Sequence, residues 1–375
     1  MATTAGGARP PLLCRAAGPS ATRWLGAASV GLACLVGGCA DIEFYWQGIA
    51  GQTDLLARAK PIADVIASTP DPALKARLAR VQEIRAFASR ELGLPDNRSY
   101  TSYADLERPY AVWNVFATPE LSLTPRQWCF PIAGCVAYRG YFAEADARAE
   151  GARLAAAGDD VHLSGIPAYS TLGYFDDPVL STFVRYREVE LARLIFHELA
   201  HQVVYVKDDT SFNESFAVAV EEAGISRWLA AEARIRSPAA MAELAADAER
   251  GRLVRASFRM LIGATRERLL EIYASNVSDG EKRAAKAAAF AALRAEYEAQ
   301  KVASANGVAL ERWFGGGANN AGIASVGLYA DRVPQFTAIL QAENGDLPRF
   351  YARVKALAAL PQAEREPALA AAALR

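Results

Sequence analysis

Apolar residues recur at helical spacing along much of the chain. The clearest stretch begins at Asp71, which can cap a helix, and Pro72, which suits a first helical turn, and it ends at Gly93. The apolar positions that keep the spacing are Leu74, Leu78, Val81, Ile84, Phe87 and Leu92. The same period predicts helices at 54–68 with an interruption near Pro61, at 144–157, 183–206, 212–236, 238–275 with a break near Gly251 or Gly263, and 280–303.

Between residues 100 and 175 the chain changes to short runs rich in Val, Tyr, Trp and Phe. Such residues favour strands, so we expect strands at 110–117, 135–142, 161–164 and 168–173. The last run precedes the 183–206 helix and could be an edge strand that pairs with an extended peptide. The sequence therefore predicts an α+β fold, mostly helical, with a small sheet before that helix and a helical C-terminal part that ends in a loose helix or a frayed tail at 361–375.

The N-terminus has the layout of a secretory signal peptide. Residues 1–38 contain three arginines and no acidic residue, and residues 24–38 are apolar or small. That run is shorter than the roughly 20 residues a transmembrane helix needs. Residues 36–39 (VGGC) resemble a bacterial lipobox, which predicts cleavage before Cys39 and its lipidation; the alternative is an ordinary cleaved signal. We expect an exported lipoprotein on a periplasm-facing membrane, with Ala40 favouring the outer membrane.

Composition limits the possible classes. Of 375 residues, 52% are hydrophobic and 22% charged, which excludes wholesale disorder. The 41 basic and 42 acidic side chains nearly cancel, so no electrostatic footprint for nucleic acid is present. Of five cysteines, Cys129 and Cys135 flank a Pro- and Gly-containing turn in the mature chain. In an oxidising periplasm we expect them to form a disulfide; the alternative is two buried thiols.

One motif carries catalytic chemistry. His197-Glu198-Leu199-Ala200-His201 lies within the expected 183–206 helix. Residues four apart share a helix face, so both imidazoles can reach one point about 2.0–2.1 Å from each, the distance of a zinc–nitrogen bond. Glu198 is turned roughly 100° from His197 and flanks that point, where it can act as general base toward an activated water.

Spacing alone does not identify the third ligand. Val204 and Lys207 stand where a metzincin has glycine and histidine, which excludes that class. The segment at 213–217 (NESFA) resembles the third-ligand helix of gluzincin metallopeptidases, and this resemblance implies that Glu214 is the carboxylate ligand. The rival ligands are Asp208, Asp209 and His162.

A narrower resemblance covers the chain from about residue 40 to 355. The strings at 128–142 (WCFPIAGCVAYRGYF), 168–182 (AYSTLGYFDDPVLST), 197–202 (HELAHQ) and 213–217 together resemble the bacterial putative aminopeptidase family. The resemblance implies an exported zinc peptidase with a zincin-like core, and the activity in the family's name implies an aminopeptidase.

Two further residues are candidates for supporting roles. Gluzincins often place an acid four residues after the ligand glutamate to orient a zinc histidine, but that position is Val218 here. Glu221, seven residues after Glu214, shares its helix face and is the candidate for that role. Tyr329 follows a glycine- and asparagine-rich segment and is the candidate to stabilise the developing oxyanion. The weaker candidates for the oxyanion are Tyr169 and Tyr205.

These features divide the chain into a signal peptide at 1–38, N-terminal helices and a small mixed sheet at 39–160, a zinc-peptidase core at 161–236 and a C-terminal helical subdomain at 237–375. They predict a membrane-anchored peptidase with Zn²⁺ as cofactor and a peptide as substrate. The alternative is a lipid-anchored binding or assembly protein with a non-catalytic zinc site. Exopeptidase and endopeptidase action stay open.

Overall fold

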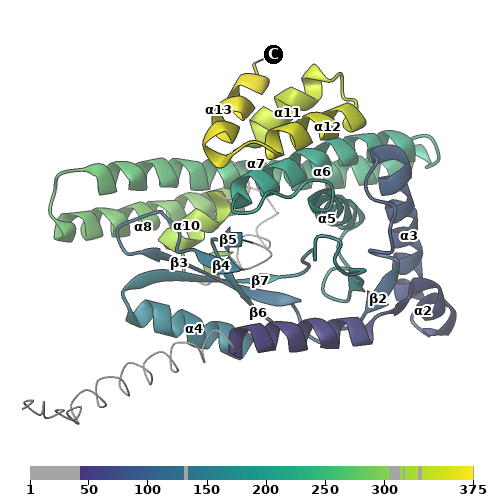
Figure 1. Ribbon diagram of the computed structural model, residues 1–375, viewed down its shortest axis with the longest axis horizontal. Helices are drawn as coiled ribbons and strands as arrows, with labels where there is room; N and C mark the ends of the chain where they lie inside the picture. Colours follow the sequence, from purple (N-terminus) through teal and green to yellow (C-terminus); the bar gives the residue numbers. More distant parts are fainter. Residues whose placement is uncertain (1–42, 131–133, 304–312, 316, 328–331, 375) are drawn as a thin grey trace, which may run out of the picture. The chain divides into compact units, whose positions relative to one another are not determined.

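Helices form most of the structure, a computed structural model that describes residues 43–130, 134–303, 313–315, 317–327 and 332–374 (Figure 1). The chain divides into two units, residues 1–49 and residues 50–375, and the second unit contains all the labelled elements. A stretch at 43–58 is also helical. The labelled helices are α2 (Ile62–Ser68), α3 (Pro72–Leu92), α4 (Glu144–Ala156), α5 (Glu188–His201), α6 (Thr210–Glu232), α7 (Pro238–Ala274), α8 (Asp279–Ala303), α10 (Asn320–Gly327), α11 (Val333–Ala342), α12 (Leu347–Ala358) and α13 (Gln362–Ala372).

Three small sheets accompany these helices, so the predicted mostly helical α+β class is confirmed. Their strand orders are β1-β2-β8, β6-β3-β7 and β4-β5. The strands are β1 (Lys60–Pro61), β2 (Ser102–Ala104), β3 (Val112–Pro119), β4 (Trp128–Phe130), β5 (Gly134–Val136), β6 (Arg139–Tyr141), β7 (Asp159–Ile166) and β8 (Val179–Leu180). Helix α4 packs on the β6-β3-β7 sheet, where Gly151 lies against Val161 and Leu163.

Local signals set the ends of α3 as the sequence predicts. The carboxylate of Asp71 accepts hydrogen bonds from the backbone N–H groups of Ala73 (2.8 Å) and Leu74 (3.2 Å), which satisfies two otherwise unpaired donors of the first turn. Gly93 ends the helix with φ +64°, a conformation that costs glycine little. The interruption expected near Pro61 is also present, because β1 separates the helical stretch at 43–58 from α2.

Two expectations were wrong. Residues 168–173 form no strand, because Leu172 and Gly173 have φ of +58° and +82° and Thr171 bonds to the carboxylate of Asp177. Helix α7 runs unbroken through both of its glycines; a Cβ added at Gly251 would lie 2.6 Å from Glu190 Oε1, so this glycine permits the contact of α7 with α5.

Of the two forms expected for the C-terminal tail, a helix and a frayed end, the structure shows the helix, α13, with Leu369 buried.

The helices that carry the candidate site residues, α5 and α6, pack directly on each other and on α3. Gly224 of α6 makes this approach close, because a Cβ added there would lie 2.8 Å from Cδ2 of Phe196 and 2.9 Å from Cδ1 of Leu92. Both neighbouring side chains are fully buried and have little room to move. The lack of a side chain at residue 224 therefore sets the distance between α5 and α6.

Across the part of the chain that the structure describes, we find no helix with the length and apolar character needed to cross a membrane.

We predict that Gly224→Ala lowers the free energy of unfolding by about 1–3 kcal/mol, because the added methyl group overpacks the contact with Phe196. The matched control is Gly263→Ala in α7, where an added Cβ meets no atom within 4 Å. That substitution should raise the free energy by about 0.5–1 kcal/mol through helix propensity. Urea denaturation of both variants measures the difference; equal effects would refute the close-packing role of residue 224.

Candidate functional site

The two motif histidines lie on one face of α5 and point toward each other. His197 Nε2 and His201 Nε2 are 3.1 Å apart, and the ring planes meet at 83°. The rest of the helix explains this presentation: Leu191, Ile195, Phe196 and Leu199 are buried in the core, which leaves the histidine face turned to the site. The predicted arrangement at i and i+4 is therefore present in the structure.

Helix α6 brings Glu214 to the same place. Asp209 caps this helix by accepting a hydrogen bond from Phe212 N, and Asn213 fixes the preceding turn, since its side chain accepts from Val206 N (2.7 Å) and donates to Val206 O (2.8 Å). Asn213 is 2% exposed, so these bonds form in a water-poor interior. Asn213 thus closes the turn between α5 and α6, and Glu214, the next residue, faces α5.

The three donor atoms have the spacing of a metal site. Glu214 Oε2 lies 3.2 Å from His197 Nε2 and 3.8 Å from His201 Nε2. A tetrahedral ion with ligands at 2.0–2.1 Å needs donor atoms about 3.4 Å apart. Two imidazoles and one carboxylate are also a donor set that zinc accepts. Throughout the described ranges, this trio alone forms such a cluster of His, Cys, Asp or Glu side chains.

The charges of the cluster suit a bound cation. Burial alone would lower the pKa of His197, but Glu214 and Glu221 raise it well above its usual value. Burial lowers the pKa of His201 to about 4, so this imidazole stays neutral at physiological pH. Burial opposes ionisation of Glu214, yet the two histidines hold its pKa below the usual value. The carboxylates of Glu214 and Glu221 thus favour positive charge at His197, while burial keeps His201 in the neutral form that can bind a metal.

Glu221 occupies the supporting position expected from its spacing. Its Oε2 lies 3.1 Å from His197 Nδ1, and its other oxygen pairs with the guanidinium of Arg193. Burial works against the charge of Glu221, but Arg193 and His197 lower its pKa. A carboxylate on Nδ1 directs Nε2 of His197 toward the cluster. Glu221, seven residues after Glu214, thus makes the contact with His197 that Val218, four residues after Glu214, cannot make.

Arg193 belongs to the candidate site through its ion pair with Glu221, and the sequence analysis missed it. It lies on α5 one turn before His197, and both its side chain and that of Glu221 are about one-tenth exposed, at 10% and 9%. The available signal was an arginine four residues before the first motif histidine, on the same helix face.

Glu198 flanks the cluster as its position in the motif predicts. Burial is the largest cause that raises the pKa of its carboxyl to about 7, and the nearby acids Glu214, Asp177 and Glu221 add to the increase. A carboxyl with a pKa near neutrality can both accept and release a proton under physiological conditions.

The structure describes some of the tyrosines considered as oxyanion candidates and not others. Tyr329 and the lipidation candidate Cys39 lie outside the described residues. Tyr169 donates its hydroxyl to Gln52. Burial raises the pKa of Tyr138, and the acids Glu214 and Glu198 add to the increase, so its neutral hydroxyl is within their electrostatic range. Tyr138 lies within the 128–142 string, but nothing in its own spacing singled it out.

The rival metal ligands have other partners. Asp209 pairs with Arg332 (2.7 Å) and Arg365 (2.8 Å), besides capping α6. His162 lies between the rings of Phe116 and Trp313, at centroid distances of 6.4 and 5.8 Å, and does not belong to the cluster.

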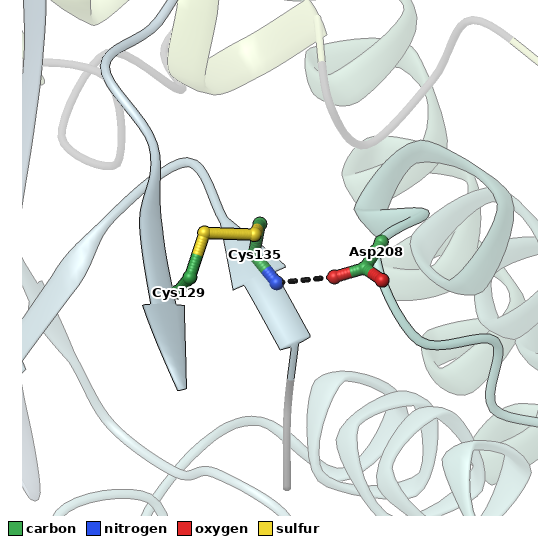
Figure 2. The surroundings of a disulfide bond; sticks show 3 residues. All are labelled: Cys129, Cys135 and Asp208. Carbon is green, nitrogen blue, oxygen red and sulfur yellow. Dashed lines mark hydrogen bonds between the residues drawn. A yellow bond between two sulfur atoms is a disulfide. The ribbon is translucent and has the colours of Figure 1, made fainter. Parts of the chain in front are cut away.

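The remaining rival, Asp208, contacts the disulfide hairpin instead (Figure 2). Cys129 and Cys135 are joined by a disulfide that links β4 to β5, and the backbone N–H of Cys135 donates to the carboxylate of Asp208. Gly134 has φ +77° and lies so close to Asp208 that an added Cβ would be 2.3 Å from its Oδ1. The hairpin therefore holds the loop that connects α5 to α6.

The model of one protein family matches residues 43–369 of the chain, and that family is described as "Putative aminopeptidase". The chain belongs to this family. Membership in this family supports peptidase activity as the general class of function. No curated protein and no solved structure matches the chain.

This family member also buries an acid next to the cluster. Asp177 is 4% exposed and accepts hydrogen bonds from the backbone N–H (2.9 Å) and the hydroxyl (2.8 Å) of Thr171. Burial raises the pKa of Asp177 from 3.8 to about 6 despite these two bonds. The ionised carboxylate therefore costs the folded state free energy at neutral pH.

We predict that Asp177→Asn stabilises the zinc-free protein at pH 7.5 by at most about 3 kcal/mol and has little effect near pH 4. Below the pKa that Asp177 has in the unfolded chain, its carboxyl is protonated in both the folded and the unfolded state, so no charge is buried on folding. The free-energy cost of the buried charge grows as the pH rises from about 4 to 6 and is complete above pH 6. The amide oxygen of asparagine can still accept from the backbone N–H of Thr171, and its NH2 group can donate to the Thr171 hydroxyl, so both contacts persist with one reversed in direction. The matched control is Asp176→Asn, whose side chain is 51% exposed. Urea denaturation at both pH values tests this, and a gain independent of pH would contradict it.

Proposed function

We propose that the protein is a zinc metallopeptidase that hydrolyses peptide bonds. One observation carries the proposal: two imidazole nitrogens and one carboxylate oxygen converge within 3.8 Å, with a carboxyl of pKa about 7 beside them. His197, His201 and Glu214 would hold the ion. When bound, zinc supplies a Lewis acid that polarises the scissile carbonyl and lowers the pKa of a water molecule.

The chain's own residues supply the proton transfers. Glu198 accepts a proton from the attacking water and then donates it to the leaving amine. Glu221 fixes the orientation of His197, and Arg193 keeps Glu221 charged. The hydroxyl of Tyr138 stays neutral at physiological pH and can donate a hydrogen bond to a substrate oxygen.

Cellular location and mode of cleavage complete the proposal. The family's name supports an aminopeptidase, which requires a free amino terminus on the substrate. The signal-like N-terminus and Cys39 support an exported, lipid-anchored protein on a periplasm-facing membrane. The Cys129–Cys135 disulfide fits an oxidising compartment.

We predict that Glu198→Gln lowers kcat/KM by about 10²–10⁴ on peptides and leaves the zinc content unchanged, because Glu198 transfers protons and is not a ligand. Peptides with free and with blocked amino termini should be compared. Hydrolysis that requires a free terminus supports an aminopeptidase, and internal cleavage an endopeptidase. Stoichiometric zinc without turnover in the unsubstituted protein would instead favour a binding protein, and an unchanged rate in Glu198→Gln would exclude the assigned role.

We predict that Glu221→Gln weakens zinc binding about 10- to 100-fold, because His197 loses the charged partner on Nδ1. Glu222→Gln is the matched control: the next residue is 39% exposed and lies 4.0 Å from Arg259, so its substitution should change the affinity by less than about twofold. Competition with a zinc-binding dye gives both dissociation constants. Equal affinities for the two variants would show that Glu221 has no part in holding the ion.

A further inference from the structure

A short loop beside the candidate site is built by its own hydrogen bonds. We call residues 171–177 the aromatic loop. Thr171 closes it: its hydroxyl donates to Asp177 Oδ1 (2.8 Å) and accepts from the backbone N–H of Phe175 (3.1 Å), and its carbonyl accepts from Tyr174 N (3.0 Å). The backbone carbonyl of Asp177 accepts from Tyr100 N (2.6 Å), which fixes the end of the loop to the core. These bonds define a single loop shape.

The tip of this loop presents two large aromatic side chains to solvent. Tyr174 is 68% exposed and Phe175 is 50% exposed. Single exposed apolar residues are ordinary on protein surfaces, but these two aromatic residues are adjacent in sequence. A loop closed by the hydrogen bonds of Thr171 thus holds an aromatic pair out of the core.

The loop lies beside the face of α5 that carries the candidate general base. A Cβ added at Gly173 would lie 3.5 Å from Oε1 of Gln202. Gln202 follows Glu198 by four residues, so the two side chains leave the same face about one turn, or 6 Å, apart. Asn97 Nδ2 donates to Gln202 Oε1 (2.7 Å) and Gln202 Nε2 donates to Ser99 Oγ (3.2 Å), which holds Gln202 in this position.

We propose that Tyr174 and Phe175 form a subsite that binds an apolar side chain of the peptide substrate. This inference rests on the proposed function and narrows its substrate class to peptides with a bulky apolar residue near the scissile bond. An extended peptide advances about 3.3 Å per residue, so residues two or three positions from the scissile bond lie roughly 7–10 Å from it, comparable to the one-turn spacing that separates Glu198 from Gln202 beside the loop. Exposed aromatic rings contribute contact area at a low cost in conformational entropy.

Charge and position favour a peptide over a lipid surface as the occupant. Asp176 follows the aromatic pair and is balanced by Arg98, 3.4 Å away, while Asp177 is buried in the loop. These charged residues give the tip no net positive charge with which to attract an anionic bilayer. The position of the loop beside the helix face that carries Glu198 favours a peptide instead.

The test measures peptide binding to the zinc-loaded full-length Glu198→Gln protein, which should hold substrates without cleaving them. The probes are labelled pentaalanine and five versions with phenylalanine at each position in turn, read by fluorescence anisotropy. We expect at least one phenylalanine peptide to bind roughly tenfold or more tightly than pentaalanine. Adding Tyr174→Ser and Phe175→Ser should abolish that preference and leave both zinc content and pentaalanine affinity unchanged.

The matched control is Ile235→Ser, a substitution of a residue that is 77% exposed. Ile235 lies just beyond the end of α6, 21 residues after Glu214 and about 30 Å from it along the helix direction. Its substitution should leave the preference for phenylalanine intact. A preference for phenylalanine that survives the double substitution, or pentaalanine and phenylalanine peptides of equal affinity, would overturn the subsite alone. No peptide binding at all would overturn the proposed function together with it.

Two other occupants give different results. If the double substitution weakens cosedimentation with phosphatidylethanolamine–phosphatidylglycerol vesicles and leaves peptide binding unchanged, the loop binds lipid and the inference is wrong. If it dissociates a dimer in sedimentation velocity and leaves peptide binding unchanged, a second copy of the chain covers the loop and the inference is equally wrong.

Discussion

The close approach of α5 and α6 is the contact on which the rest of the site depends. Helix α5 supplies two of the three donor atoms and α6 supplies the third, so the cluster exists only where the two helices face each other. Two buried features set that geometry: Gly224, whose missing side chain leaves room for Phe196, and Asn213, whose amide closes the connecting turn on Val206. Packing in the core thus determines distances at a polar site, because dense interiors transmit small displacements.

A chain of charges extends from this contact to the far side of α5. Arg193 lies between Glu221 and Glu190, and Glu190 also pairs with Arg255 of α7 at 2.6 Å. Buried ion pairs of this kind add little net stability, because desolvation offsets their attraction. Their effect here is on geometry: a charged Glu221 fixes the imidazole of His197. The same reasoning applies to Asp177, whose charge opposes folding while it closes a loop beside the site.

Features with short-range physical causes could be predicted from the sequence. The capped ends of α3 and the paired histidines of α5 depend on residues within a few positions, and both were predicted. The 168–173 run was mistaken for a strand because its aromatic content suits one, while the carboxylate of Asp177 supplies the bonds that a neighbouring strand would have made. A break of α7 was expected near Gly251 or Gly263, because the contact of Gly251 with Glu190, 61 residues earlier on α5, leaves no local pattern in the sequence. Arg193 was missed for a similar reason, since its partner is 28 residues away.

The hydrogen bond between the disulfide hairpin and Asp208 links two segments that are 73 residues apart. Asp208 itself has φ +67°, which few side chains tolerate, and Gly134 opposite it has no space for a Cβ. The two positions therefore constrain each other's replacements over evolutionary time. A lineage that acquires a larger residue at either position must remodel the other segment as well, so hairpin and loop should be inherited or lost together.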